Sequence, residues 1–357
     1  MAAKPAIVVY GNCVGGFLTG HLRQMPAVVE HYDIYWFRSF VAQSKGDEPL
    51  DLGALSRCEI LLEQVGNFRD DVQRRGGAHF RDIPVPPNCR RLRFPPPFMN
   101  TLWPFVASDP RSDSAVRPWI EEGPYPRYVC NSLILEIMKE EKDPARVYER
   151  FNAIRIKDRV DLDRLHALTM AKIRGLDRDS DVRLGDFIER NFQTRRLFHM
   201  QIHPAGPVLR YICEEIFGAL GFLNALPEGH LDEIEHGRGP GAYDAPIHPE
   251  IIEHFGLEWA RDLSYCHFAE GYFSYDEFIR RYIRFDWTPL LYIGAHLAAR
   301  DMLLEAEAIL VEAARRPHAP SSVFHKLGNV RQRLGWPDAA RAAFVAAAYA
   351  PRSFHYL

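Results

Sequence analysis

The stretch at residues 6–16 reads Ala-Ile-Val-Val-Tyr-Gly-Asn-Cys-Val-Gly-Gly. Its first half is a short apolar run rich in β-branched residues, which is typical of a strand buried on both faces. The run ends at Gly11, and apolar residues at helical spacing follow from Val14 onward. A strand, a tight glycine turn and a helix form the unit that exposes backbone N–H groups at the carboxyl edge of a parallel sheet. This stretch therefore predicts an α/β fold with a ligand site at the turn.

Cys13 is the side chain that this turn places at the start of the helix, directly after Asn12. A thiol at a helix N-terminus lies near the positive end of the helix dipole, which favours the thiolate. The sequence leaves three interpretations open. Cys13 is a covalent nucleophile, it lines a pocket for a ligand thiol, or it is a small residue kept for packing.

Three further apolar runs at residues 32–37, 57–65 and 89–94 predict three more strands. Helical or polar stretches separate them, so the first hundred residues predict an open, mostly parallel sheet with right-handed crossovers. Ligands of such sheets bind beyond the carboxyl ends of the strands. The polar residues expected at those ends are Arg38, Gln64, Asn67 and, in the proline-rich segment 95–103, Asn100.

From residue 128 onward, apolar stripes at helical spacing predict a large helical portion. Residues 195–202 return to strand composition and lead to His203 and Pro204. Pro207 suits the first turn of the next helix, so His203, like Cys13, is expected where a strand meets a helix. A neutral imidazole there is suited to accept a proton near pH 7. The alternative is a buried structural histidine, the role that we expect for His199.

Composition narrows the class of protein. The chain has 357 residues, 47% of them hydrophobic and 25% charged, with a net charge of −3. These values predict a substantial core and argue against a general nucleic-acid binder. The sequence shows neither a membrane-spanning run nor a signal peptide, and its six cysteines have no close spacing, so we expect a reduced, cytoplasmic protein. Residues 228–244 predict a loop, and we expect no metal there because His230 and His236 lie off a common helical face.

The C-terminal end repeats itself with a period of 34 residues. Gly294 matches Gly328, and Leu310 matches Phe344. Small residues where two helices cross, with large residues between them, resemble the tetratricopeptide pattern. The other matched pairs are Leu290 with Phe324, Ile293 with Leu327, Ala306 with Ala340, Ala313 with Ala347 and Pro317 with Pro351. Because two repeats bury little by themselves, we expect them to pack on the preceding domain or on a second protomer.

Three elements are expected to meet at the edge of the sheet: Asn12 with Cys13, the turn after Gln64, and His203. A thiolate beside an imidazole can attack an acyl group, and amide donors can hold the oxyanion. The set resembles the site of SGNH-type esterases, with Cys13 in place of the serine. Alternatively, Cys13 only lines the pocket and His203 deprotonates a sugar hydroxyl directly. The residues thus predict a site for acyl chemistry.

Three segments carry a more specific resemblance. They are Val-Tyr-Gly-Asn-Cys at residues 9–13, Asp-Val-Arg-Leu-Gly-Asp-Phe-Ile-Glu-Arg-Asn-Phe at 181–192, and Arg-Leu-Phe-His-Met-Gln-Ile-His-Pro at 196–204. Together they resemble the WcbI-type capsule polysaccharide biosynthesis proteins over roughly residues 5–225. That resemblance implies an acetyltransferase that takes acetyl-coenzyme A as acyl donor and a sugar or polysaccharide as acceptor. We expect no nucleic-acid partner and no transmembrane segment, because of the net charge and the lack of a long apolar run.

Coenzyme A carries phosphates, which need cations or helix N-termini. Under the resemblance, Cys13, His203 and Asn12 are the expected catalytic residues. The residues expected to bind the cofactor are Gly11, Asn12, Cys13, Val14, Gly15, Arg38, Gln64, Asn100, Arg195, Arg196 and His203, and Arg90, Arg91 and Arg93 are further phosphate candidates. We expect an acyltransferase-like domain at residues 1–285 and two tetratricopeptide-like repeats at 286–357. The alternatives are an esterase with a cysteine nucleophile and a non-catalytic scaffold that recruits partners through its repeats.

Overall fold

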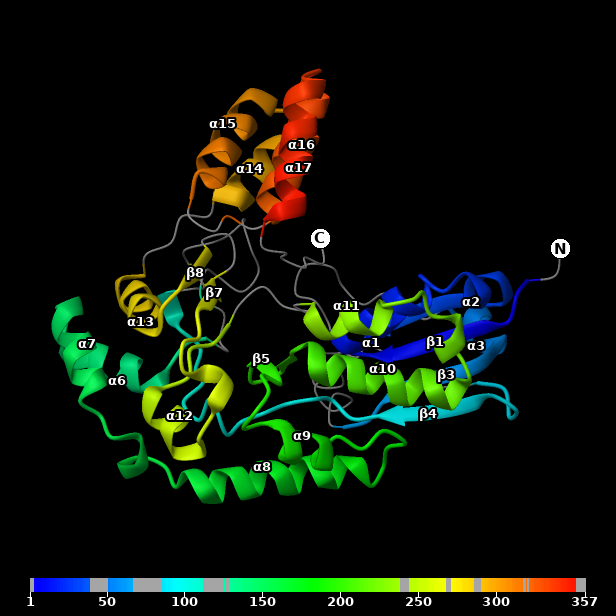
Figure 1. Ribbon diagram of the computed structural model, residues 1–357, viewed down its shortest axis with the longest axis horizontal. Coiled ribbons are helices and arrows are strands. Elements are labelled where there is room, and N and C mark those ends of the chain that lie inside the picture. Colours follow the sequence, from blue (N-terminus) through cyan, green and yellow to red (C-terminus); the bar gives the residue numbers. More distant parts are fainter. Residues whose placement is uncertain are drawn as a thin grey trace. The chain divides into compact units, whose positions relative to one another are not determined.

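The computed structural model describes residues 3–38, 51–66, 85–111, 125, 129–237, 244–267, 271–285, 290–316, 319 and 321–350 (Figure 1). The chain divides into two compact units. The first comprises residues 1–98, 166–198 and 202–240, and the second comprises residues 99–165, 199–201 and 241–357. The expected division after residue 285 stays a prediction.

The first unit contains a four-stranded sheet in the order β2-β1-β3-β4, and every neighbouring pair is parallel. All four predicted strands are therefore confirmed. In the register of the sheet, Gly11 lies opposite Arg38, and Gln64 lies opposite Phe94. The strands are β1 (Ala6–Gly11), β2 (Asp33–Arg38), β3 (Cys58–Gln64) and β4 (Arg90–Phe94).

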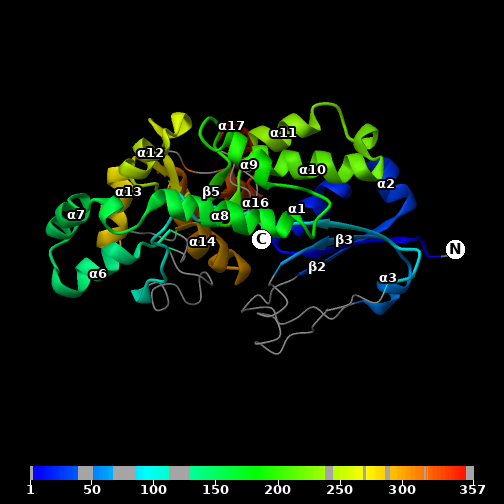
Figure 2. The same ribbon diagram turned by 90° about the horizontal axis from the view of Figure 1, so that it is seen from below.

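The connections of this sheet place helices on both of its faces. Helix α1 (Cys13–Leu22) connects β1 to β2 on one face, and α3 (Leu52–Ser56) precedes β3 on the other (Figure 2). Because the chain leaves β1 first toward β2 and later returns to β3 on its other side, the order of the strands reverses between β1 and β3. The carboxyl ends at such a reversal are where open α/β sheets bind ligands. Gly11 and Gln64 end these two strands.

Beyond the parallel sheet, the chain up to residue 237 is mainly helical, and two expectations about it were wrong. The predicted strand at 195–202 is only β5 (Phe198–Met200), which pairs with β6 (His203–Pro204) in a two-stranded sheet apart from the parallel one. Pro204 has no N–H to donate to a ladder. The Ala205 N–H still donates to the Leu197 carbonyl at 2.8 Å, and α10 begins at the next residue, so the pairing ends there. The predicted loop at 228–244 contains a helix, α11 (His230–His236). The other helical elements are α2 (Pro26–His31), α8 (Leu162–Asp177, which begins in the second unit), α9 (Gly185–Asn191), α10 (Gly206–Leu220) and η2 (Leu223–Ala225).

Apolar stripes at helical spacing are confirmed with one exception. On α8 the buried positions include Leu162 and Met170, whereas Leu168 is 59% exposed. Helix α10 buries Val208, Ile212 and Ile216, and its first turn contains Pro207 as expected. Met170 of α8 and the stripe of α10 are therefore among the buried residues of the unit that carries the candidate site.

The second unit contains helices and one antiparallel pair of short strands. Segment 95–103, which crosses from the first unit into the second, contains neither helix nor strand, as its prolines predict. The elements are α6 (Ser132–Glu140), α7 (Pro144–Asn152), η1 (Ile156–Asp158), α12 (Pro249–Phe255), η3 (Glu258–Ala260), β7 (Tyr265–His267), β8 (Gly271–Phe273), α13 (Tyr275–Arg284), α14 (Leu290–Ala299), α15 (Leu303–Ala314), α16 (Ser321–Arg333) and α17 (Pro337–Tyr349).

The last four helices, α14 to α17, form pairs with matching contacts. A Cβ added at Gly294 of α14 would lie 2.6 Å from the Leu310 side chain of α15. A Cβ added at Gly328 of α16 would lie equally close, 2.6 Å, to the Phe344 ring of α17. The period of 34 residues therefore repeats one close crossing of two helices. Pro317 and Pro351 lie outside the described residues. None of the described helices has the length and apolarity needed to cross a membrane.

Candidate functional site at the carboxyl edge of the sheet

The junction between β1 and α1 places Cys13 at the first position of the helix. Asn12 is the residue before it and has extended backbone geometry, and its Oδ1 accepts a hydrogen bond from the Val14 N–H at 3.0 Å. This is the contact of an N-cap residue, which satisfies one of the donors left over at a helix start. Cys13 is half-buried. The helix therefore starts at Cys13, as the sequence predicts.

Gln64 joins the end of β3 to this junction. Its Oε1 accepts a hydrogen bond from the Asn12 N–H at 2.9 Å. The residue is 3% exposed, and its Nε2 is buried with no hydrogen-bond partner among the described residues. A buried donor without an acceptor costs roughly 1–3 kcal/mol, so such groups are rare and call for an explanation.

Trp36 of β2 supports the junction from another neighbouring strand. Its Nε1 donates a hydrogen bond to the Gly11 carbonyl at 3.1 Å. Its ring lies so close to α1 that a Cβ added at Gly16 would come within 2.7 Å of it. The Arg38 guanidinium lies over the same ring, 5.1 Å from its centre. The glycines after Cys13 are therefore needed for packing against Trp36, which also positions a cation at the end of β2.

His203 lies in β6, shortly before the start of α10, and is half-buried. The start of this helix is fixed by a backbone contact. A Cβ added at Gly206 would lie 1.9 Å from the Glu235 carbonyl oxygen of α11, so only glycine fits there. His203 is thus held close to a helix start, as the sequence predicts, although its strand does not belong to the parallel sheet.

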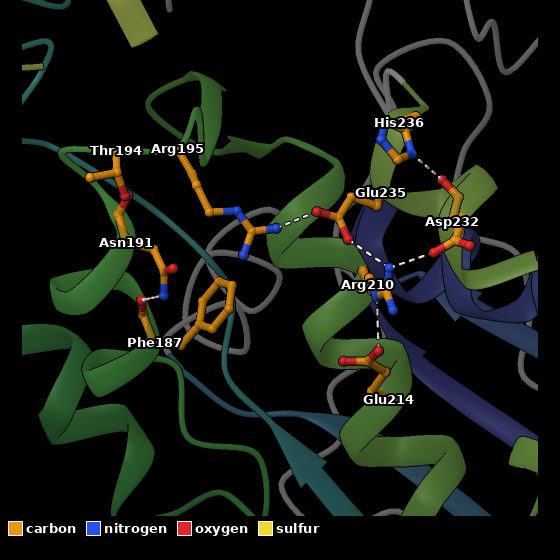
Figure 3. A network of polar contacts seen from close by, with 9 residues as sticks. All are labelled: Phe187, Asn191, Thr194, Arg195, Arg210, Glu214, Asp232, Glu235 and His236. Carbon is orange, nitrogen blue, oxygen red and sulfur yellow. Dashed lines mark hydrogen bonds and ion pairs between the residues drawn. The ribbon is translucent and has the colours of Figure 1, made fainter. Parts of the chain in front are cut away.

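Charged side chains reinforce the contact between α10 and α11 (Figure 3). Arg210 of α10 donates hydrogen bonds to Glu214 at 2.8 Å, to Asp232 at 2.7 Å and to Glu235 at 2.7 Å. The hydrogen bond to Glu214 is the largest of the contacts that raise the pKa of Arg210. Glu235 also accepts a hydrogen bond from Arg195, so one carboxylate connects two arginines. The predicted phosphate ligand Arg195 is therefore already in an ion pair.

Ten of the predicted site residues belong to the first unit, and Asn100 belongs to the second. The contacts above bring together Gly11, Asn12, Cys13, Val14, Gly15, Arg38 and Gln64 around the β1–α1 junction. His203, Arg195 and Arg196 lie at or near the approach to α10. Asn67 lies outside the described residues. On β4, Arg93 is 3.5 Å from the Glu63 carboxylate, and Arg90 donates to the Ala219 carbonyl.

Two comparisons with known proteins found a match. The sequence profile of the polysaccharide biosynthesis enzyme WcbI matches residues 6–224, which is more than half of the chain. The chain belongs to the WcbI family. Among curated proteins, none matches the chain. One solved structure of a WcbI polysaccharide biosynthesis enzyme is similar over 96% of this chain and 99% of its own, with 19% sequence identity and a TM-score of 0.56. That structure is described as the native protein without a disulfide bond between coenzyme A and one of its cysteines.

In this WcbI-family chain, burial raises the pKa of four of the cysteines other than Cys13. Burial raises the pKa of Cys58 and of Cys130 to about 12, and it raises the pKa of the fully buried Cys213 as well. Burial also raises the pKa of Cys89, whose Sγ lies 3.6 Å from that of Cys58. All six cysteines lie in the described part of the chain, and none of them forms a disulfide.

Sequence reasoning missed two contacts of α1. It predicted Trp36 only as part of a strand, although a tryptophan near two helix glycines is a signal of close packing. It also missed the contact of His21 with His230. The Nδ1 of His21 lies 2.8 Å from the Nε2 of His230. Within the described ranges, no group of three histidine, cysteine, aspartate or glutamate side chains could hold a metal ion.

Proposed function

We propose that this member of the WcbI family transfers an acetyl group from acetyl-coenzyme A to a sugar hydroxyl during polysaccharide biosynthesis. The observation that carries the proposal is the position of Cys13, the first residue of α1, at the point where the strand order reverses. Open α/β sheets bind ligands at this point, and a helix start favours a thiolate or a phosphate. The related structure, described in terms of coenzyme A and a cysteine, supports the same ligand. A cytoplasmic location is part of the proposal.

Two routes lead to the same products. In the first, His203 takes the proton of the sugar hydroxyl while the oxygen attacks the thioester carbonyl. The C–S bond then breaks, and the coenzyme A thiolate receives the proton from His203. In the second, the Cys13 thiolate attacks the thioester and expels the coenzyme A thiolate. The sugar hydroxyl then gives its proton to His203 and attacks the acetyl group on Cys13, which restores the Cys13 thiolate, and His203 passes the proton to coenzyme A. Each route forms one ester bond and breaks one thioester bond overall.

The cations available for the phosphates of coenzyme A differ in their surroundings. Arg38 extends over Trp36 at the end of β2, beside Gly11. Arg195 is bonded to Glu235, so a phosphate would have to compete with that carboxylate. We place the phosphates near Arg38 first, because it lies at the β1–α1 junction itself, and treat Arg195 and Arg196 as further ligands.

The experiment measures thiol release from acetyl-coenzyme A with and without a panel of sugars, with acetylated products identified by mass spectrometry. Acetylated sugar that forms only in the presence of the enzyme supports the transferase. Acetate release that no sugar accelerates favours the esterase. If the protein neither turns over nor binds acetyl-coenzyme A, the scaffold alternative stands.

Alkylation locates the ligand within the protein. Iodoacetamide is expected to label Cys13 first near neutral pH, and coenzyme A is expected to protect it. Cys213 is the internal control, because burial raises the pKa of its thiol and no ligand should change its slow labelling. Equal labelling of Cys13 with and without saturating coenzyme A would contradict its place in the site.

The C-terminal helices support a separate proposal. The repeated contact of Gly294 with Leu310 and of Gly328 with Phe344 supports two tetratricopeptide-like repeats over residues 286–357. They would recruit a protein partner or a second copy of this chain. Sedimentation of the full chain against a chain ending at residue 285 measures whether the repeats carry self-association.

A further inference from the structure

The side-chain amide of Gln64 has one atom in use and one without a partner. Its Oε1 accepts from the Asn12 N–H at 2.9 Å, and its Nε2 has no acceptor within the described part of the chain. The two amide atoms are not interchangeable, because a backbone N–H only donates and must face an oxygen. The Asn12 N–H therefore fixes the orientation of the amide, and Nε2 is the atom left over.

The place of this amide is fixed by its contact with Gly11. A Cβ added at Gly11 would lie 3.2 Å from the Gln64 Cβ and 3.3 Å from its Oε1. The side chain thus lies against the backbone of the β1–α1 junction, one residue away from the Asn12 N–H that it holds. Because Nε2 is bonded to the same carbon as Oε1, the donor without a partner also lies at this junction, next to the residue that precedes Cys13.

Two polar atoms of Asn12 at this junction are already engaged. The Asn12 N–H is bonded to Gln64, and the Asn12 Oδ1 is an acceptor that is bonded to the Val14 N–H. The Asn12 N–H is therefore not available to hold an oxyanion while Gln64 accepts from it. Gln64 Nε2 is a neutral donor at the positive end of the ten-residue helix α1, where a carbonyl oxygen with partial negative charge is favoured.

We infer that Gln64 Nε2 donates a hydrogen bond to the carbonyl oxygen of a thioester bound beside Cys13. Gln64 thereby distinguishes an acylated coenzyme A from an analogue without the acyl oxygen. The inference rests on the proposed function, because it assumes that the acyl donor binds at this junction.

The test compares two ligands that differ in this oxygen. Acetyl-coenzyme A has the carbonyl, and ethyl-coenzyme A, a thioether of nearly the same shape, does not. Calorimetry is expected to show that the natural protein binds acetyl-coenzyme A about tenfold more tightly, as the gain of one hydrogen bond predicts. In Gln64→Glu at pH 8, a carboxylate oxygen still accepts from Asn12 but the donor is gone. This variant should lose the tenfold preference and keep its affinity for ethyl-coenzyme A.

Gln24→Glu is the matched control, because Gln24 is exposed just after α1 and undergoes the same change of charge. It should keep the preference. If Gln64→Glu keeps the preference, or weakens both ligands equally, the inference is wrong while the proposed function stands. The inference is also wrong if the natural protein binds both ligands with equal affinity. If the natural protein binds neither ligand, the proposed function fails, and the role of Gln64 fails with it.

Discussion

Cys13 and His203 both lie near the start of a helix that follows a short strand, but different contacts hold the two junctions. At the first, side chains make the contacts: Asn12 caps α1, and Gln64 and Trp36 bind the backbone next to it. At the second, backbone meets backbone. The residue before α10 is Ala205, whose side chain has no polar atom, and Gly206 lies against the Glu235 carbonyl.

This difference determines how each junction tolerates change. A hydrogen bond from a side chain contributes about 0.5–1.5 kcal/mol and can be removed without displacing the backbone. A close contact of two backbones leaves no room for an added atom, so the helices must move. We therefore expect substitutions at the first junction to alter chemistry more than stability, and substitutions at Gly206 to alter stability more than chemistry.

His203→Gln should produce the largest effect. Glutamine keeps the approximate size of the side chain and one hydrogen-bonding group but removes the base, so acetyl transfer should fall by about 10²–10⁴-fold. The melting temperature should change little because His203 is half-buried, and the affinity for coenzyme A should change little because glutamine can still make one hydrogen bond to the ligand. Steady-state kinetics and calorimetry measure these quantities.

His199→Gln is the comparison variant, only four residues away. His199 is 7% exposed, and its Nδ1 lies 2.8 Å from the buried Asp244 carboxylate. Loss of that contact should lower the free energy of unfolding by about 1.5–3 kcal/mol, as for a hydrogen bond to a charged group.

Two outcomes would contradict the prediction for His203→Gln. A rate of acetyl transfer within a few-fold of that of the natural protein would remove His203 from the mechanism. A large loss of stability in this variant would assign His203 a structural role.

Gly206→Ala tests the second junction. The added Cβ would lie 1.9 Å from the Glu235 carbonyl oxygen, so α10 and α11 must separate. Overpacking of this kind lowers the free energy of unfolding by about 1–3 kcal/mol, and we expect the upper end of that range. Urea unfolding measures the change.

The control for this change lies on the same helix. At the exposed Gly218 an added Cβ has its nearest neighbour at 3.4 Å, so Gly218→Ala should be neutral or stabilising. If the two variants unfold at the same urea concentration, the close contact of α10 with α11 does not hold this junction.

The two junctions also differ in how far the sequence predicts them. The first was predictable, because a β-branched run, Gly11 and the capping residue Asn12 are local signals that lie within seven positions. Four strands and the apolar stripe of α10 were predictable for the same reason. The glycine pattern of the C-terminal helices was visible as a repeat of 34 residues, and the close contacts at Gly294 and Gly328 show its physical basis.

The second junction was not predictable, because its contacts join residues far apart in the sequence. Nothing near Gly206 indicates that the Glu235 carbonyl will lie against it. Helix α11 has only seven residues and begins directly after Gly229. Its short sequence is therefore hard to tell from a loop. The same holds for Gln64. The sequence places it at the end of a strand, but its contact with Asn12 depends on β1 and β3 being neighbours in the sheet.

The contact of His21 with His230 links α1 to α11, and it leads to a prediction about pH. The two ring nitrogens lie 2.8 Å apart, so one ring must donate and the other accept. Burial and the neighbouring His230 lower the pKa of His21 from 6.5 to about 4. Near the pair, the Glu233 carboxylate lies 3.9 Å from His230 Nδ1, and the Phe17 ring packs on His21 at 4.3 Å.

Between pH 6.5 and pH 4 the unfolded chain therefore binds a proton at His21 that the folded protein does not. The contribution of His21 to the free energy of unfolding is constant above pH 6.5. It falls as the pH decreases from 6.5 toward 4, and it falls no further below pH 4. His21→Asn removes the titrating group, so its stability should decline less steeply than that of the natural protein between pH 6.5 and pH 4. Urea unfolding at a series of pH values gives the free energy of unfolding of each protein. Subtracting the two curves cancels the titration of the carboxylates, which both proteins share. His31→Asn, at an exposed position on α2, should leave the pH dependence unchanged. Parallel curves for the natural protein and His21→Asn would show that folding does not lower the pKa of His21.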